Sequence, residues 1–433
     1  MSSRAARPQR DHHLNASPAP GARKAALAFI FITVLIDVLA FGVIIPVLPH
    51  LVQEMVGGSI STAAWWVGGF GVAFSLVKFL CSPIQGTLSD RYGRRPVILL
   101  SCLGLGLDFV FMALAPTLAW LFVGRMISAA TSASFTTANA YIADVTTPEA
   151  RAKGFGMIGA AFGLGFIVGP LVGGVLGDID LRLPFWFSAG LALLNFCYGV
   201  FVLPESLPVE KRTKRFDWSH ANPVGSLKLL RSYPQVFGLA AVIFIANLAH
   251  YVYPSVFVLF GDYRYGWGQK EVGYVLALVG VLSVIVNVAL VGRMVKAMGE
   301  RRAVLLGLAC GAVGFAVYGM AGQGWIFLLG LPISALWAIA APATQSLITS
   351  QVGTDAQGRV QGALTSLVSL AGIAGPAIFA GSFGWFVSDA APVKLPGIPF
   401  FIAAVMLVIA WLVTLRFTDA AHMPAKVGGD PIP

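Results

Sequence analysis

Four ionisable side chains lie deep inside long apolar runs of this sequence: Asp37, Lys78, Asp108 and Arg125. A charge is costly in an apolar medium, so such residues usually have a function or an opposite charge beside them. Desolvation favours the neutral form of a carboxylate and a nearby cation favours its charged form, so a carboxylate can load and release a proton. Asp37 and Asp108 are therefore candidate proton carriers. Arg125 stays charged, so we expect it to tune an acid or to hold an anion.

Spacing suggests partners for these four charges. Asp108 and Arg125 lie at nearly equal distances from the turn between their two apolar runs, which places both at similar depth in a helical hairpin. Asp37 and Lys78 flank the preceding turn in the same way. The alternative for Asp108 is a structural role in which it only neutralises Arg125. The alternative for Lys78 is a snorkelling side chain or a counter-charge.

The composition places these residues in a membrane protein. Of the 433 residues, 57% are hydrophobic and 11% charged, whereas soluble domains carry about a quarter charged residues. The basic residues fall in alternate loops, so the net charge of +10 does not indicate a nucleic-acid partner. All four cysteines lie in apolar runs, which indicates small buried side chains, with neither a disulfide framework nor a metal site.

Twelve apolar runs are long enough to cross a hydrocarbon layer of about 30 Å. They lie near 26–50, 63–84, 96–115, 118–142, 154–176, 184–203, 236–260, 271–292, 302–321, 325–350, 358–383 and 398–416. We expect an all-α membrane protein with six-helix bundles at 25–203 and 236–416. A cytoplasmic linker would span 204–235, a disordered cytoplasmic tail 1–24 and a second cytoplasmic tail 417–433.

The loop cations set the expected orientation. With the N-terminus inside, only a few loop cations fall outside: Arg182, Arg264, Lys270 and Lys394. Cytoplasmic loops carry the excess of Lys and Arg in membrane proteins. The sequence therefore predicts a multi-pass protein of the cell (inner) membrane with both termini in the cytoplasm.

The two halves repeat each other at an offset of 206 residues. The charged loop Gly86–Pro96 recurs in degraded form as Gly292–Arg302, and Gly169-Pro170 recurs as Gly375-Pro376. Duplicated six-helix halves with a substrate between them are a transporter plan. The pattern predicts that the halves rock against each other to give alternating access.

The charged loop supplies six residues of a candidate gate: Gly86, Asp90, Arg91, Gly93, Arg94 and Arg95. The glycines permit a tight turn, and the aspartate could cap a helix of the other half while an arginine holds it. Such a latch would favour the outward-open state. The alternative, simple anchoring of the arginines on the inner side, leaves the aspartate and the glycine spacing unexplained.

A stripe of small residues marks the fifth run. Gly165, Gly169 and Gly173 recur every four residues, which forms a groove for a neighbouring helix. Pro170 can bend that helix. We expect a packed contact at the interface between the halves; the alternative is generic membrane packing.

These motifs together resemble the major facilitator superfamily. The loop from Gly86 matches its signature G-x-L-x-D-R-x-G-R-R, and Gly124-Arg125 matches its arginine motif. From Gly156 the chain reads G-x8-G-x3-G-P-x2-G-G through Gly174, the pattern typical of the antiporter branch. Asp37–Gly42 is similar to the twelve-helix tetracycline/proton antiporters.

The resemblance implies a proton-coupled antiporter that exports a small amphipathic organic compound, with tetracycline-like drugs as the leading class. The proton gradient would supply the energy, without a cofactor. Two departures argue against tetracycline itself as the substrate. The stretch Val304–Gly311 lacks the membrane acid of those antiporters, and Ser283 and Asn287 lie near the positions where those antiporters carry a histidine and a glutamine. Whether magnesium accompanies the substrate stays open. No acid lies deep in the last six runs, so coupling would depend on the first half or on substrate charge.

Candidate substrate contacts combine amides and aromatic rings: Asn139, Asn247, His250, Tyr251 and Gln345. They would suit a bulky amphipathic ligand, although each could instead form a hydrogen bond between helices. The remaining functional alternatives are an exporter or symporter of a native metabolite and a non-transporting membrane receptor or scaffold. A receptor or scaffold has no need of two aspartates in the membrane. The sequence shows no nucleotide loop or catalytic set, so an enzyme is not expected.

Overall fold

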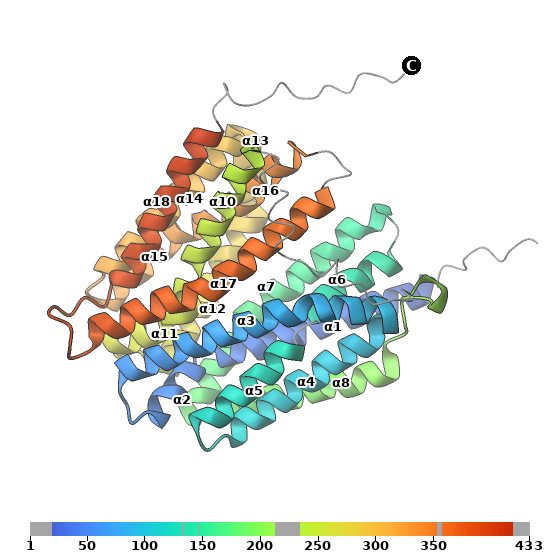
Figure 1. Ribbon diagram of the computed structural model, residues 1–433, viewed down its shortest axis with the longest axis horizontal. Helices are drawn as coiled ribbons and strands as arrows, with labels where there is room; N and C mark the ends of the chain where they lie inside the picture. Colours follow the sequence, from blue (N-terminus) through green and yellow to red (C-terminus); the bar gives the residue numbers. More distant parts are fainter. Residues whose placement is uncertain (1–19, 132–133, 147, 213–233, 353–356, 419–433) are drawn as a thin grey trace, which may run out of the picture.

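The computed structural model describes residues 20–131, 134–146, 148–212, 234–352 and 357–418. These residues form an all-helical protein in two halves (Figure 1). The N-terminal half contains α1 (Pro20–Ile44), α2 (Leu48–Met55), α3 (Ile60–Tyr92), α4 (Arg94–Leu114), α5 (Leu118–Thr131), α6 (Ser134–Val145), α7 (Pro148–Ile179) and α8 (Leu183–Val202).

The C-terminal half begins with α10 (Pro234–His250), α11 (Val252–Tyr265), α12 (Gln269–Ile285), a π-helical turn (Val286–Leu290) and α13 (Val291–Met298). It continues with α14 (Glu300–Met320), α15 (Gly324–Ala335), a 3₁₀ turn (Leu336–Ile339), α16 (Ala340–Thr349), α17 (Gln357–Val387) and α18 (Ile398–Phe417). A 3₁₀ turn at Val209–Lys211 begins the linker.

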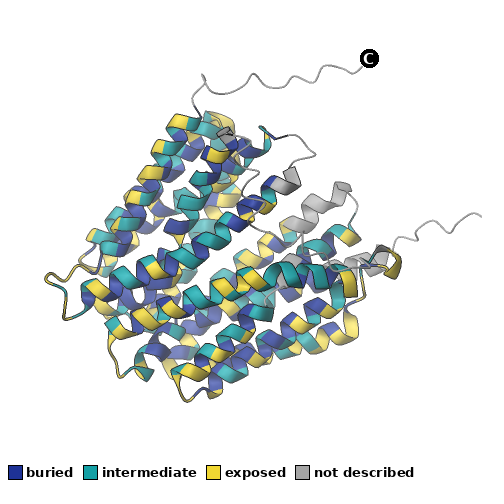
Figure 2. Ribbon diagram, viewed as in Figure 1, coloured by how far each residue is buried: buried dark blue, intermediate teal, exposed yellow. Residues whose placement is uncertain are grey.

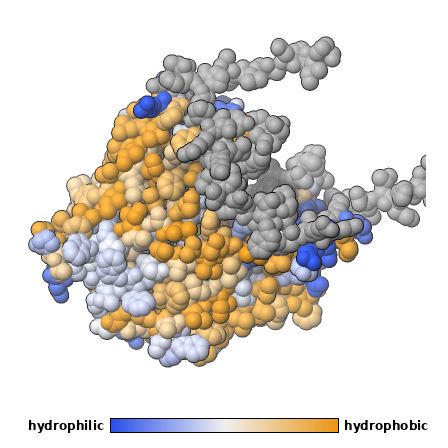
Figure 3. Space-filling model, viewed as in Figure 1, coloured by the Kyte–Doolittle hydropathy of each residue, from blue (hydrophilic) through white to orange (hydrophobic). Residues whose placement is uncertain are grey.

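Eleven described helical segments are long and apolar enough to cross a membrane. The twelfth expected span, 118–142, is divided into α5 and α6 around residues 132–133, which lie outside the described part of the chain. Apolar residues cover much of the coloured part of the face shown in Figure 3, and Figure 2 shows buried residues where helices face one another. The protein is therefore a multi-pass membrane protein.

The predicted boundaries need one correction. The expected tail 1–24 is too long, because α1 already begins at Pro20. Residues 1–19, most of the linker (213–233) and residues 419–433 lie outside the described part of the chain.

The internal repeat is visible in the backbone. Gly93 joins α3 to α4 with a φ of 107°, and Gly299, its counterpart 206 residues later, joins α13 to α14 with a φ of 82°. A positive φ is unfavourable for other residues, which explains glycine at both joints. Pro170 and Pro376 likewise both lie inside long helices, α7 and α17.

Two helix pairs form the main contacts between the halves, α7 with α12 and α3 with α17 (Figure 1), and α11 also contacts α3 and α2. A Cβ on Gly174 of α7 would lie 3.0 Å from the Gly273 Cα of α12, and one on Gly71 of α3 would lie 2.9 Å from the Pro376 side chain. The Ser61 hydroxyl donates to the Gly384 carbonyl oxygen over 2.8 Å. These contacts lie at the end opposite the Gly86–Pro96 loop, which we call the sealed end.

The other end of the same helices, the loop end, is open. In Figure 1 the two halves diverge toward this end. The close glycine contacts between the halves, at Gly68, Gly71 and Gly174, lie toward the sealed end. The structure is therefore closed at the sealed end, and the halves are apart at the loop end.

Candidate functional site

The predicted pairing of Asp108 with Arg125 is confirmed. The antiparallel helices α4 and α5 bring Arg125 Nη1 to 3.7 Å from Asp108 Oδ2, and Asp108 is only 1% exposed. Gly124 makes room for the acid, because a Cβ there would lie 3.0 Å from Asp108 Oδ1. Ser128 on the next turn of α5 also lies beside this carboxylate.

Two further side chains of α3 complete this group. The Arg125 guanidinium lies 4.5 Å from the centre of the Phe74 ring, a cation–π contact. Lys78, one turn along α3, is close enough to Arg125 for the two cations to repel each other. Lys78, Asp108 and Arg125, which we call the charge cluster, therefore combine two cations with one carboxylate.

Asp37 lies half-buried on α1 in different surroundings. It acts electrostatically on the Cys102 thiol of α4. One turn before it on α1, the Thr33 hydroxyl donates to Asn195 Oδ1 over 3.3 Å, and the Asn195 amide lies 3.6 Å from Cys102 Sγ. Asn195 was not among the predicted site residues, although a single amide in an otherwise apolar span is a usable signal. The shared depth of Asp37 and Lys78 stays a prediction.

The gate residues form contacts within their own half. Asp90 accepts a hydrogen bond from Arg94 Nη1 over 2.5 Å, and Arg94 Nε donates to Asp144 Oδ2 over 3.1 Å. Arg95 donates to the Val200 carbonyl oxygen, and Arg91 stacks on its neighbour Tyr92. The expected cap on a helix of the other half is absent here among the described residues, because the halves are apart at this end.

A linker carboxylate that the sequence analysis missed caps α4 instead. Glu205 Oε1 accepts from the Arg94 backbone N–H over 2.9 Å, which satisfies a free donor at the helix N-terminus. Glu205 also lies 3.6 Å from Arg212, and its carboxylate occupies the space that a side chain at Gly93 would need. The glycine is thus required by both its φ and this contact.

The glycine stripe requires a correction. Gly165, Gly169 and Gly173 pack against α1 of the same half, where a Cβ on Gly169 would lie 2.7 Å from the Leu39 carbonyl oxygen. The prediction of an interface between halves was wrong for these three positions, since α1 presents the facing small residue, Gly42. The adjacent face of α7, through Pro170 and Gly174, is the one that meets α12.

The candidate substrate residues divide into two groups. His250 is exposed at the end of α10, with its ring 5.8 Å from Tyr253 and from Trp337. Tyr251 lies at the break between α10 and α11 and packs against Gly372 of α17.

The other three candidates are half-buried in helices. Asn247 donates to the carbonyl oxygen of Ile243 in its own helix, over 2.8 Å. Asn139 lies on α6 and Gln345 on α16.

A π-helical turn, Val286–Leu290, was not expected from the sequence. It follows a close contact of α12 with α7, where a Cβ on Gly163 would lie 3.3 Å from the Val284 side chain. The turn contains Asn287, whose amide donates to the Ser283 carbonyl oxygen over 2.8 Å. Such turns are frequent at functional sites.

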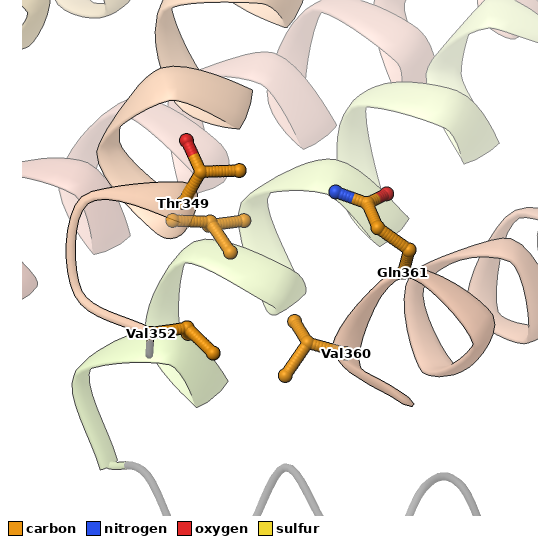
Figure 4. Close-up of a pocket in the computed structure, with 5 residues that line it drawn as sticks. Thr349, Val352, Val360 and Gln361 are labelled. Carbon is orange, nitrogen blue, oxygen red and sulfur yellow. The ribbon is translucent and has the colours of Figure 1, made fainter. Parts of the chain in front are cut away.

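Two surface hollows lie away from these residues. One, between the end of α16 and the start of α17, is lined by Thr349, Val352, Val360 and Gln361 (Figure 4) and has no room for a water molecule. The other, of about 350 Å³, lies at the sealed end, beside Tyr263. The described residues contain no cluster of three metal-ligating side chains.

Comparison with known proteins agrees with the architecture. The profile of the Major Facilitator Superfamily matches residues 30–376. Tetracycline resistance protein, class C, from Escherichia coli is 38% identical over 353 residues, which cover 82% of this chain and 88% of that protein. Multidrug resistance protein 2 of Bacillus subtilis (strain 168) is 30% identical over 361 residues, covering 82% and 88%.

A solved structure shows the same fold. The crystal structure of the human organic anion transporter MFSD10 superimposes with a TM-score of 0.67 at 24% identity, over 92% of this chain and all of that one. The two helical halves, the signature loop between α3 and α4, and a family profile that matches residues 30–376 lead to one assignment: the chain belongs to the Major Facilitator Superfamily.

Proposed function

We propose that the protein is a proton-coupled antiporter that exports small amphipathic organic compounds, with tetracycline-like drugs as the leading class. The observation that carries this proposal is the buried Asp108 carboxylate beside Arg125 in the middle of the first half. Relatives named for tetracycline and multidrug resistance support the direction and the substrate class.

Coupling follows from how the two states change the surroundings of Asp108. In the present state Arg125 favours its charged form and burial favours its neutral form. Rocking of the halves changes the hydration around Asp108, so the balance between these two effects shifts and a proton is bound or released. Asp37 is the second candidate carrier. The proton gradient would supply the energy, with no cofactor.

Orientation links the structure to the transport cycle. The Lys and Arg bias supports a cytoplasmic location for the loop end and for both termini. The state described here would then be open to the cytoplasm and ready to accept a drug. The Asp90 latch would form in the opposite state, when the loop ends of the two halves come together.

Purified protein in liposomes that contain a pH-sensitive dye would test the proposal. Tetracycline or another amphipathic drug should trigger proton movement, and Asp108→Asn or Asp37→Asn should abolish it. Asp178→Asn is the matched control, because Asp178 is exposed at the end of α7. Drug movement that continues unchanged in both aspartate variants would refute proton coupling through these residues.

A further inference from the structure

Lys78 has no ionic partner among the described residues. Its neighbour Arg125 is paired with Asp108, and both Lys78 and Arg125 are cations, so the charge cluster retains one uncompensated positive charge. Breaking a buried pair leaves a costly charge, and a lone ammonium inside a membrane span is costly for the same reason. An uncompensated cation inside a span therefore indicates an interaction with an anionic group.

The ammonium of Lys78 lies near the guanidinium of Arg125, close enough for the two cations to repel each other. The residue lies six positions, or about 9 Å, before the end of the expected apolar run at 84. In this state its ammonium therefore stays at the depth of the charge cluster and does not extend to the end of that run.

The helix geometry directs Lys78 toward the space between the halves. At about 100° per residue, it lies about 60° around α3 from Ser75, on the α17 side, and about 40° from Phe74, on the α5 side. The exposed apolar residues Leu76 and Leu80 lie about 160° away from it on the same helix. Lys78 therefore points between α17 and α5, and the opposite face of α3 meets lipid.

Lys78 also lies one turn from a contact between α3 and α17. A Cβ on Gly372 would lie 3.4 Å from the Ser75 hydroxyl, and Lys78 is one turn closer to the loop end, where the halves are apart. The residue is exposed. An accessible cation with low-dielectric surroundings binds an anion more strongly than one in bulk water.

The second half supplies aromatic surface at this level. Tyr251 packs against Gly372, the same glycine that contacts Ser75, so its hydroxyl lies close to α3. His250 precedes it in the chain, and the Trp337 ring lies 5.8 Å from the His250 ring. A cation on one wall and aromatic rings on the other match a ligand with an anionic group on an aromatic body.

We propose that Lys78 binds the anionic group of the substrate, so that this transporter selects aromatic organic anions such as carboxylates or sulfonates. This inference deepens the proposed function and depends on the same site. It explains why one cation is left over in the charge cluster when Asp108 neutralises Arg125.

Two dyes with the same xanthene ring test the charge selection: fluorescein, an anion, and rhodamine 123, a cation. Binding is measured by fluorescence anisotropy on the purified full-length protein, which requires no proton gradient. Lys78→Gln should weaken fluorescein binding roughly tenfold or more, because a desolvated ion pair is lost. It should leave rhodamine 123 binding unchanged or tighter. Lys78→Arg should retain fluorescein binding, and Lys296→Gln, which removes an exposed cation on α13, is the control.

Equal weakening of both dyes, or unchanged fluorescein binding in Lys78→Gln, would overturn the inference. The proposed function is tested separately by drug-triggered proton flux in liposomes. Charge-selective binding without proton flux would refute the antiporter and support Lys78 as an anion site. Normal proton flux, together with dye binding that is the same in Lys78→Gln and in the unmodified protein, would support the antiporter and refute Lys78 as an anion site.

Discussion

Replacing Asp108 with asparagine should destabilise the protein by about 3 to 5 kcal/mol, the cost of leaving one member of a buried ion pair alone. The change keeps the shape of the side chain and removes its charge. At 3.7 Å, and at an effective dielectric constant of about 20, the lost attraction alone is about 4 kcal/mol. Lys78 increases the effect, because Arg125 then faces a second cation without any compensating carboxylate.

A double-mutant cycle separates this electrostatic effect from packing. Asp108→Asn, Arg125→Gln and the double variant are unfolded at equilibrium in mixed detergent micelles, and the free energies of unfolding are compared. The double variant should be more stable than the sum of the single effects by about 3 kcal/mol. Adding Lys78→Gln to Asp108→Asn should also restore part of the stability.

If the two single changes in unfolding free energy add to that of the double variant within about 0.5 kcal/mol, Asp108 and Arg125 are independent sites, and the proposed ion-pair coupling is refuted. Asp178→Asn, at the exposed end of α7, controls for the loss of a carboxylate and should change stability little.

Three further variants test other parts of the structure. Gly173→Val should destabilise the protein by roughly 1 to 3 kcal/mol or more, because its Cβ would collide with the α1 backbone. The control Gly156→Ala has open space around it and should change the free energy of unfolding little. Equal effects of the two variants would contradict the close packing of α7 on α1. Ser61→Cys with Gly384→Cys, in a chain without the native cysteines, should form a disulfide that arrests transport until a reductant is added; full transport by the cross-linked protein would show that the sealed end need not open. Glu205→Ala should cost about 1 kcal/mol of stability through loss of the α4 cap, measured by equilibrium unfolding, and a stability equal to that of the unmodified protein would mean the cap contributes nothing.

The sequence predicts a feature correctly where that feature depends only on the number of residues between a side chain and the turn of its own helical hairpin. Asp108 and Arg125 lie at matching distances from one turn, and antiparallel helices of fixed rise must then place them at one depth. The span boundaries follow in the same way from hydrophobic length.

Features that depend on which helix becomes a neighbour were not predictable. The stripe at Gly165 shows that another backbone comes close, but identical glycine spacing would suit α1 or α12. Glu205 reaches α4 only because the chain returns to it after four more helices. The side-by-side placement of Lys78 and Arg125 likewise required the packing of α3 on α5.

The contact between Gly174 and Gly273 has a mechanical consequence. Packed helices usually interlock through side-chain ridges, which hold a fixed crossing angle. At this point backbone meets backbone without side chains between them, so α12 can pivot against α7 here with little steric resistance while the two helices stay in contact. A larger residue at either glycine should slow the exchange between the two states and therefore lower the turnover rate. Equilibrium binding of a drug to the open state should stay largely unchanged.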